Sequence, residues 1–314
     1  MSATMHGTLC VPAGRTADTV MVLVPGATYN HTYWDFPYRP ETYNFRRAMN
    51  DAGYATFVVD RLGTGASSRP PSALLTASLQ AEAVHQVIQA LRGGRIGGTV
   101  FRKTILGGHS LGSLISVIEA GTYHDADAVV LTGITHRIVA PEVVKIFTSS
   151  FYPAALDPAF TGKSYDPGYL TTRPGTRGTD FYAPATTDPV VLATDEATKD
   201  VFSATEALDG LGVADLLPYS RRIQHPVLLA VGDQDQFFCD PLSGNCASTA
   251  ALKAQEDPYF GSAACLHTYV QPGAGHDLNL ATNTAPYQQA VRDWADAFVG
   301  AGPVPVTPPA EACA

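Results

Sequence analysis

Short runs of apolar, mostly β-branched residues recur along this chain of 314 residues, and they constrain its fold more than any other feature. Most of these runs are bounded on at least one side by glycine, proline or aspartate, which is typical of parallel strands buried on both faces. The runs are Thr19–Val24, Tyr54–Val59, Lys103–Leu106, Ala128–Thr132, Pro226–Val231 and Leu266–Val270.

Stretches with helical spacing of apolar residues separate these runs. They are Glu41–Ala52, Ser72–Leu91, Leu111–Ala120 and Pro286–Val299. Strands that alternate with helices pair in parallel, and the connecting helices cover the two faces of the sheet. The sequence therefore predicts an α/β fold with one mostly parallel sheet.

The alternation stops between residues 136 and 222, where proline, glycine, threonine and tyrosine are frequent and no clean strand is expected. Helical patches are expected near residues 141–149, 188–194 and 201–208. An insertion of this length is too long for a bare loop, so we expect a cap over one end of the sheet. The predicted division is a core of residues 1–135 and 223–300, a cap of residues 136–222 and a proline-rich tail of residues 301–314.

Charge and hydropathy exclude several classes of protein. The net charge is −9, which argues against nucleic acid or an anionic membrane surface as a partner. No apolar run approaches the ~18 residues that a membrane span needs. No leader is visible, so we expect a cytoplasmic protein or an exported one whose leader was removed. The oligomeric state is left open.

The sharpest motif is Gly-His-Ser-Leu-Gly at residues 108–112, a G-x-S-x-G pattern. It follows the predicted strand Lys103–Leu106 and opens the predicted helix Leu111–Ala120. A serine on a sharp strand-to-helix turn projects its hydroxyl out of the sheet, as a nucleophile must. The motif predicts that Ser110 is a nucleophile; the alternative is a purely structural turn.

With this motif the chain resembles the α/β-hydrolase superfamily of serine esterases and lipases, over roughly residues 19–299. Leu23–Ala27 is similar to the superfamily's H-G-x segment, with Pro25 where many members have histidine. Asp60–Ser67 is similar to its D-x-x-G-x-G-x-S turn. The resemblance implies an α/β-hydrolase fold with an inserted cap and a Ser-Asp-His triad.

A serine hydroxyl needs a base, and the superfamily order places the acid and then the histidine after the serine. His276 lies in a Gly-Ala-Gly-His-Asp loop after the strand Leu266–Val270, where the superfamily has its base. His267 falls inside that strand and is expected to pack. His109 is expected to be a side chain of the elbow.

The acid is expected just after the strand Pro226–Val231. The superfamily pattern there, G-x-x-D, selects Asp235 in Gly-Asp-Gln-Asp-Gln, and Asp233 is the alternative. An oxyanion hole needs two backbone N–H donors. We expect them at Leu111, after the nucleophile, and at Ala27, because Pro25 has no N–H. The aromatic residues 28–34 are expected either to line an acyl pocket or to pack this loop against the cap.

Five cysteines leave the redox state open. The simplest disulfide joins Cys239 to Cys246 in a loop-like segment; the alternatives are Cys246 with Cys265, or free thiols throughout. We expect no metal site, because these cysteines lack C-x-x-C spacing and no close histidine pair completes a zinc site. No G-x-G-x-x-G motif opens a helix after a strand and no P-loop is present, so no cofactor is expected.

The sequence therefore predicts a serine hydrolase that cleaves a carboxylic ester, lactone or thioester. An acyltransferase or cyclase with the same triad is the alternative, and a non-catalytic binding module on the same fold is the rival class. The partner is a small-molecule acyl substrate. Aromatic residues of the cap suggest an apolar cavity, although they are equally suited to a cap core: Tyr152, Tyr165, Tyr169, Phe181 and Tyr182.

Overall fold

A computed structural model describes residues 3–217, 219–240, 244–308 and 313. Seven strands form one sheet in the order β1-β3-β2-β4-β5-β9-β10, and all neighbours pair in parallel except β1 and β3. The strands are β1 (Gly7–Cys10), β2 (Thr19–Val24), β3 (Ala55–Val59), β4 (Lys103–His109), β5 (Ala128–Thr132), β9 (Val227–Gly232) and β10 (His267–Gln271). The predicted mostly parallel α/β sheet is confirmed.

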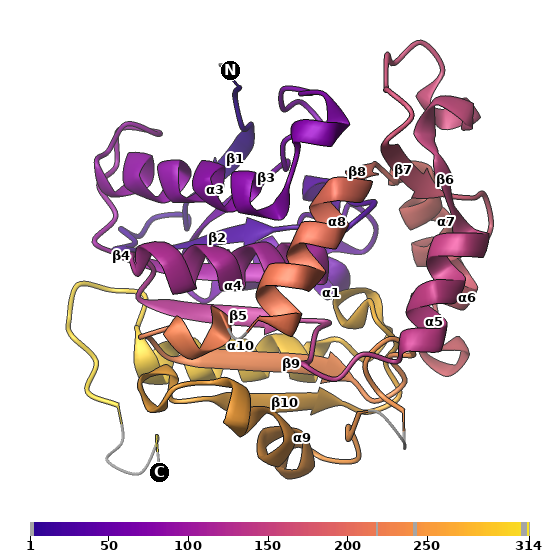
Figure 1. Cartoon of the computed structure of the whole chain (residues 1–314). Helices are drawn as coiled ribbons and strands as arrows, with labels where there is room; N and C mark the ends of the chain where they lie inside the picture. The colour runs from indigo at the N-terminus through magenta and orange to yellow at the C-terminus, as the bar shows by residue number, and fades with distance from the viewer. Residues whose placement is uncertain (1–2, 218, 241–243, 309–312, 314) are drawn as a thin grey trace.

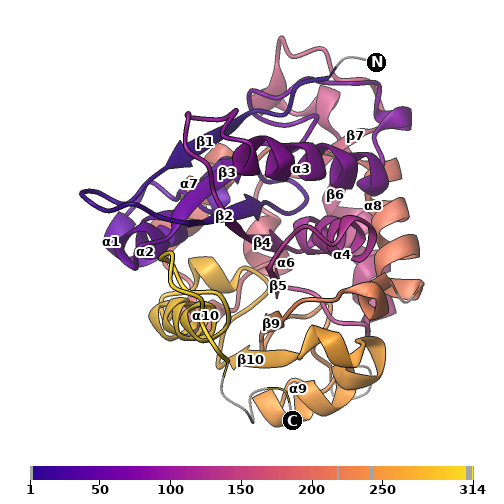
Figure 2. The same ribbon diagram turned by 90° about the vertical axis from the view of Figure 1, so that its left-hand side faces the viewer.

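Helices cover both faces of this sheet (Figures 1 and 2). Helices α3, α4 and α8 lie together on one face, and α1, α2 and α10 lie on the other, while α9 packs beside β10. The helices are α1 (Pro40–Tyr43), α2 (Phe45–Asp51), α3 (Ala77–Arg92), α4 (Leu111–Tyr123), α5 (Ala140–Lys145), α6 (Arg177–Asp180), α7 (Pro189–Thr198), α8 (Ala204–Gly210), α9 (Thr249–Glu256) and α10 (Ala285–Phe298).

Two predictions about the core need correction. The single helix expected over Glu41–Ala52 is two helices, because Asn44 adopts an extended conformation and its side chain accepts a hydrogen bond from the Arg47 N–H as the N-cap of α2. The edge strand β1 was missed, because its partly exposed residues carry no continuous apolar run.

The expectation of no strand between residues 136 and 222 is wrong. Three short strands form a second, antiparallel sheet: β6 (Phe151–Pro153), β7 (Tyr169–Thr172) and β8 (Phe202–Ser203). Strands this short show no periodicity, and their pairing depends on contacts between distant residues. With α5, α6 and α7 they lie beyond the carboxyl ends of the main strands (Figure 1). Helix α8 instead packs against α3 and α4.

The cysteines also differ from expectation in part. The structure bonds Cys239 to Cys246, and it bonds Cys265 to Cys313, a pair that the sequence did not predict and that excludes the alternative of Cys246 with Cys265. Cys10 carries a free thiol. The segment expected to be a loop contains helix α9. Within the described ranges, the structure has no helix that is both long and apolar enough to span a membrane.

Candidate active site

Ser110 stands at the turn between β4 and α4 with a strained backbone. Its φ is 51° and its ψ is −120°, in a region that non-glycine residues rarely occupy. The structure holds this conformation by hydrogen bonds on both sides: the Ser110 N–H donates to the Thr132 carbonyl at 2.8 Å, and the Ser113 N–H donates to the Ser110 carbonyl at 2.8 Å. Strain of this kind concentrates at functional sites.

The two outer glycines of the motif permit this turn. A Cβ at position 108 would lie 2.4 Å from the Gly112 carbonyl oxygen, and a Cβ at position 112 would lie 2.2 Å from the Val24 carbonyl oxygen. Neither position can therefore carry a side chain without moving the backbone. The pattern of small residues around Ser110 is explained by close packing of β2, β4 and α4.

His276 and Asp235 form a buried hydrogen-bonded pair. The distance from His276 Nδ1 to Asp235 Oδ2 is 2.8 Å, and Asp235 Oδ1 accepts a hydrogen bond from the Phe237 N–H at 3.0 Å. Burial by itself lowers the pKa of His276, but the charge of Asp235 and this hydrogen bond outweigh burial and raise the pKa above its ordinary value. The pair follows β9 and β10, whose carboxyl ends bring the two loops together.

The alternative acid, Asp233, points elsewhere. Its Oδ1 accepts hydrogen bonds from the Gly273 N–H at 2.7 Å and from the Gln234 side chain at 3.2 Å. Asp233 therefore ties the loop after β9 to the loop after β10, and the structure brings Asp235, not Asp233, to His276. His267 begins β10 and contacts the Phe298 ring, as expected for a packed residue.

Ser110 and His276 line the same cavity. No hydrogen bond joins the Ser110 hydroxyl to the His276 ring among the described residues. Such bonds are often long in empty active sites and shorten when substrate binds. The nitrogen of His276 that faces the reaction would be Nε2, because Nδ1 is held by Asp235.

Ala27 and Leu111 line this cavity as well. Leu111 is the first residue of α4, so its N–H has no partner within the helix. Ala27 precedes Thr28, a β-branched residue with φ of 64°. Such a residue in the left-handed region is a genuine outlier, so other groups must hold the loop in place.

Three groups hold the loop around Ala27. Arg61 donates to the Gly26 carbonyl at 3.0 Å, Arg177 donates to Thr28 Oγ1 at 2.9 Å, and the Asp200 N–H donates to the Thr28 carbonyl at 2.8 Å. Both guanidinium groups are fully buried. Two of these three contacts come from the segment between β5 and β9, so that segment fixes the strained loop.

Sequence reasoning missed a second histidine–aspartate pair beside the first. His109 Nε2 lies 3.1 Å from Asp277 Oδ1, and Asp277 Oδ2 accepts a hydrogen bond from the Tyr29 hydroxyl. Burial, then the neighbouring His276, lowers the pKa of His109 well below its ordinary value, and burial raises the pKa of Asp277 to about 6. His109 also stacks on Tyr33, with ring centroids 4.2 Å apart. Only its adjacency to Ser110 could have drawn attention to it.

An ion pair between Arg177 and Asp195 lies next to this pair. Asp195 receives two hydrogen bonds from Arg177, at 2.8 and 2.9 Å, and one from the Tyr182 hydroxyl at 2.8 Å. The guanidinium carbon of Arg177 lies 4.3 Å from the Tyr29 ring centroid. A buried charge that lost its partner here would cost about 3–5 kcal/mol, so the network is held together as a unit.

The cavity in front of Ser110 is small and apolar, with a volume of about 100 Å³. Phe181 is the one of the five aromatic residues singled out in the cap that lines it. Tyr165 and Tyr169 belong to a separate apolar cluster that also includes Leu62 and Leu75, and Tyr182 belongs to the Arg177 network. The other lining residues are Ala27, Tyr29, Leu111, Leu114, Ile134, Val143, Ile146, Phe147, Phe151, Phe202, Ala207, Leu211, Phe237 and Phe238.

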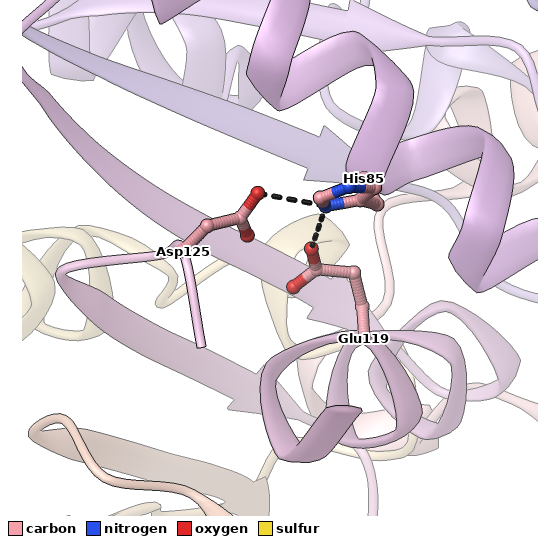
Figure 3. Close-up of side chains that lie close together, drawn as sticks. All are labelled: His85, Glu119 and Asp125. Carbon is pink, nitrogen blue, oxygen red and sulfur yellow. Dashed lines mark hydrogen bonds and ion pairs between the residues drawn. The ribbon is translucent and has the colours of Figure 1, made fainter. Parts of the chain in front are cut away.

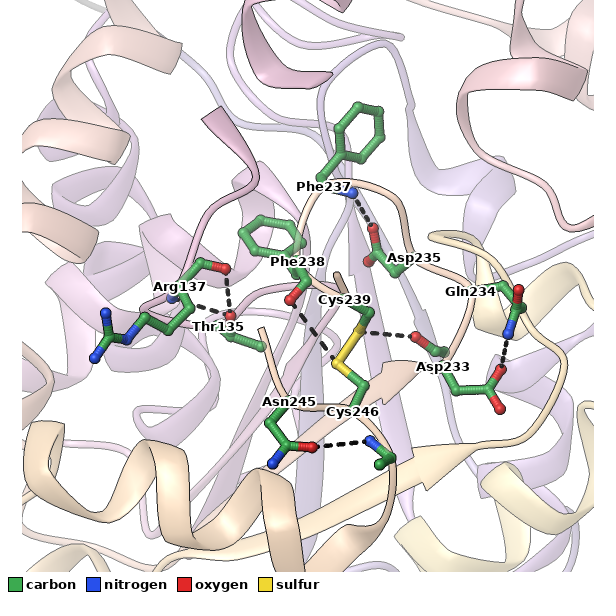
Figure 4. The surroundings of a disulfide bond; sticks show 12 residues. Thr135, Arg137, Asp233, Gln234, Asp235, Phe237, Phe238, Cys239, Asn245 and Cys246 are labelled. Carbon is green, nitrogen blue, oxygen red and sulfur yellow. Dashed lines mark hydrogen bonds between the residues drawn. A yellow bond between two sulfur atoms is a disulfide. The ribbon is translucent and has the colours of Figure 1, made fainter. Parts of the chain in front are cut away.

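The disulfide between Cys239 and Cys246 lies next to the loop that carries Asp235 (Figure 4). The Cys239 N–H donates to the Asp235 carbonyl at 2.7 Å, and the Cys239 sulfur lies 3.2 Å from the Gly232 carbonyl oxygen. Phe237 and Phe238, which both line the cavity, connect Asp235 to Cys239. The disulfide therefore limits the movement of the segment that carries the acid.

Comparisons with known proteins agree with this architecture. Residues 21–297 match the sequence model described as the alpha/beta hydrolase family. A search of curated proteins by sequence finds no match. Because the identities to the similar solved structures are low, those structures support the fold alone.

Three similar solved structures cover nearly the whole chain. A thermophilic esterase from Thermogutta terrifontis has a TM-score of 0.63 and 18% identity, with 93% of each chain covered. The enol-lactonase from Burkholderia xenovorans LB400 has a TM-score of 0.62 and 18% identity, with 93% of this chain and 96% of that chain covered. A monoacylglycerol lipase from Paleococcus ferrophilus has a TM-score of 0.56 and 17% identity, with 94% and 98% covered.

Proposed function

Because the chain belongs to the alpha/beta hydrolase family, we propose that it is a serine hydrolase that cleaves a carboxylic ester, lactone or thioester through an acyl-enzyme on Ser110. One observation carries the proposal: a strained serine lies at the mouth of an apolar cavity that the hydrogen-bonded His276 also lines. Ala27 and Leu111 border the same space.

In the proposed mechanism, Ser110 Oγ attacks the substrate carbonyl carbon while His276 Nε2 takes the hydroxyl proton. Asp235, on Nδ1, orients the ring and stabilises the imidazolium that forms. The N–H groups of Ala27 and Leu111 donate to the oxyanion, and removal of one such donor typically costs about 3–4 kcal/mol of barrier. His276 then returns the proton to the leaving group, and water hydrolyses the acyl-enzyme by the same steps.

The shape and chemistry of the cavity favour a short apolar acyl group. Its volume of about 100 Å³ is below the ~150 Å³ of an engineered protein cavity that holds benzene. Its walls are mostly aliphatic and aromatic, so a charged acyl group would lose its hydration without a partner. Esters of acyl chains of about two to four carbons are therefore the proposed substrates, and neutral lactones of similar size suit the same space.

A chain-length series tests this proposal. Nitrophenyl esters from acetate to dodecanoate, with matched lactone and thioester panels, should give the highest kcat/KM for the short acyl chains. A fluorophosphonate probe should label Ser110, and peptide mapping identifies the residue. An unlabelled Ser110 would contradict the enzyme and favour a binding module, and product formed only with an added alcohol or amine would favour acyl transfer.

A further inference from the structure

A second cluster of titratable side chains lies at the other end of α4, away from Ser110 (Figure 3). It consists of His85 from α3, Glu119 from the last turns of α4 and Asp125 from the loop that leads to β5. His85 Nδ1 lies 2.8 Å from an Asp125 carboxylate oxygen and 3.9 Å from a Glu119 carboxylate oxygen. One ligand-type atom of each residue lies within 4.8 Å of the others.

The carboxylate oxygens of this cluster have few hydrogen-bond donors. Glu119 is fully buried, and among the described residues no N–H or hydroxyl group donates to either of its oxygens; its polar neighbour is the Asp125 carboxylate. Asp125 Oδ1 is buried and equally unpartnered, while Oδ2 accepts from His85 and Gln89. A buried polar group without a partner costs about 1–3 kcal/mol, and more when it is charged. One oxygen of each carboxylate lies within 4 Å of His85 Nδ1, and three of the four carboxylate oxygens lack a donor, so the cluster can accept a cation.

Within the described part of the chain, no cationic side chain donates a hydrogen bond to these three oxygens. The charge of Arg92 acts on Glu119, but its hydrogen bonds go to the Asp127 carboxylate and to the Asp125 backbone carbonyl. Exposed Glu82 on α3 adds a further negative charge near Tyr123. Glu119 is fully buried, so solvent does not compensate its carboxyl group either. The carboxyl end of α4 also carries the partial negative charge of the helix.

We propose that His85, Glu119 and Asp125 bind a divalent zinc-type cation. One imidazole nitrogen and two carboxylates match the donors that Zn²⁺ accepts in proteins, whereas Ca²⁺ requires six to eight oxygens. Zinc ligands at about 2.0–2.2 Å from the metal lie ~3.4 Å apart in a tetrahedron. The present separations of 2.8 and 3.9 Å lie on either side of that value.

The geometry leaves a route for the ion and an open position. The His85 side chain is 27% exposed and that of Asp125 is 13% exposed, whereas Glu119 closes the inner side of the cluster. The His85 ring stacks on Tyr123 with centroids 3.9 Å apart, which fixes its orientation. Metal ligands must be deprotonated, so in the bound state His85 would carry its proton on Nε2 and Glu119 would bind as the carboxylate.

The proposed ion would join α3 to α4 and to the loop before β5. Glu119 lies nine residues after Ser110, or about 13 Å along the helix, so the ion has no part in the proposed acyl transfer. Sequence inspection looked for cysteine pairs and neighbouring histidines. It missed this cluster because its ligands are at positions 85, 119 and 125 and meet only through the packing of α3 on α4.

Metal-free protein, prepared with a chelator, tests the proposal by equilibrium dialysis against ZnCl₂. Wild type should bind one tight equivalent, and Glu119→Gln and His85→Ala should each weaken that equivalent at least tenfold. Glu82→Gln, an exposed carboxylate on the same helix, is the matched control and should bind as wild type does. The melting temperature of wild type should rise with ZnCl₂, since a ligand that binds only the folded state stabilises it, and that rise should be absent in Glu119→Gln.

Co²⁺ provides an independent readout that needs no variant to fold. A low-coordinate site with one nitrogen and two carboxylate ligands should give an intense visible absorption that ZnCl₂ abolishes by competition. Equal binding of Zn²⁺ by wild type and Glu119→Gln would overturn the proposal, because the ion would then be held elsewhere. Weak, octahedral-type Co²⁺ absorption in wild type would overturn it as well.

Discussion

Histidine and carboxylate side chains surround both ends of helix α4, but the carboxylates at the two ends differ in how many hydrogen bonds they accept. At its amino end, Asp235 and Asp277 each have both carboxylate oxygens hydrogen-bonded, and each holds one histidine. At its carboxyl end, no N–H or hydroxyl group among the described residues donates to either oxygen of Glu119, and Asp125 has one oxygen left over. Glu119 is buried as fully as Asp235 and Asp277, so for these three carboxylates the number of donors supplied by the surroundings makes the difference.

This contrast separates two uses of a buried histidine–carboxylate cluster. Where every carboxylate oxygen has a donor, the histidine is held in one orientation and its free nitrogen can move a proton. Where oxygens lack donors, the cluster is short of positive charge and suits a cation. The identity of the residues does not distinguish these cases; the hydrogen bonds around them do.

The largest expected effect comes from removing the proposed nucleophile, Ser110, at the amino end. Ser110→Ala should lower kcat by about four to six orders of magnitude, as for other triads. The melting temperature should not fall, because alanine leaves the packing of the turn intact. Zinc affinity at the carboxyl end should also stay at the wild-type value. Hydrolysis near the wild-type rate would place the nucleophile elsewhere.

The acid at the amino end gives the next largest effect. Asp235→Asn should lower kcat about 10⁴-fold, because an amide favours the wrong tautomer of His276. Asp233→Asn is the matched control on the same loop and should change kcat only a few-fold. Rates are compared with one short-chain ester at constant pH. A larger loss in Asp233→Asn would reverse the assignment of the acid.

Variants of the Arg177 network test whether its hydrogen bonds contribute to activity as well as to stability. Arg177→Met should lower the free energy of unfolding by about 3–5 kcal/mol, because it leaves Asp195 buried without its partner. The double variant Arg177→Met/Asp195→Asn should regain much of that stability. Its kcat should remain about 10–100-fold low, since Thr28 and the neighbouring Ala27 are no longer held. Recovery of both quantities would limit the network to a structural role.

The two disulfides differ in position, so removing each one should have different effects on kcat and on stability. Serine in place of Cys239 and Cys246 should lower kcat a few-fold, because the Asp235 loop loosens. Serine in place of Cys265 and Cys313 should lower stability more, by about 1.7 kcal/mol relative to the first pair, since its 48-residue separation exceeds the other of 7. The ranking is read from kcat and from denaturant unfolding. Equal effects on kcat would remove the link to Asp235.

The smallest expected effect concerns pH. Burial lowers the pKa of His276, while the charges of Asp235 and then Asp277 raise it, and the base works only when neutral. Asp277→Asn removes one of these charges, so the acidic limb of the kcat/KM profile should move to lower pH. The shift is small because Asp277, with a pKa of about 6, is itself partly protonated there. A limb that moves to higher pH would contradict this account.

Much of the fold could be read from local patterns. The six apolar runs coincide within a few residues with the parallel strands, because a strand buried on both faces must be apolar along its whole length. The turn at Ser110 was equally readable, since a Cβ at position 108 or 112 would lie less than 3 Å from backbone atoms, so both positions require glycine. The edge strand β1 and the sheet β6-β7-β8 were not readable, because they are short or partly exposed.

By itself the sequence determined the alternating architecture and the position of Ser110 at the turn between a strand and a helix. Only the tertiary structure decided which of Asp233 and Asp235 reaches His276, that His109 has Asp277 as its partner, and that Cys265 pairs with Cys313. The same holds for His85, Glu119 and Asp125. Patterns along the chain reflect local backbone and burial requirements, whereas the donors that surround a buried charge come from distant segments whose contacts form only when the chain has packed.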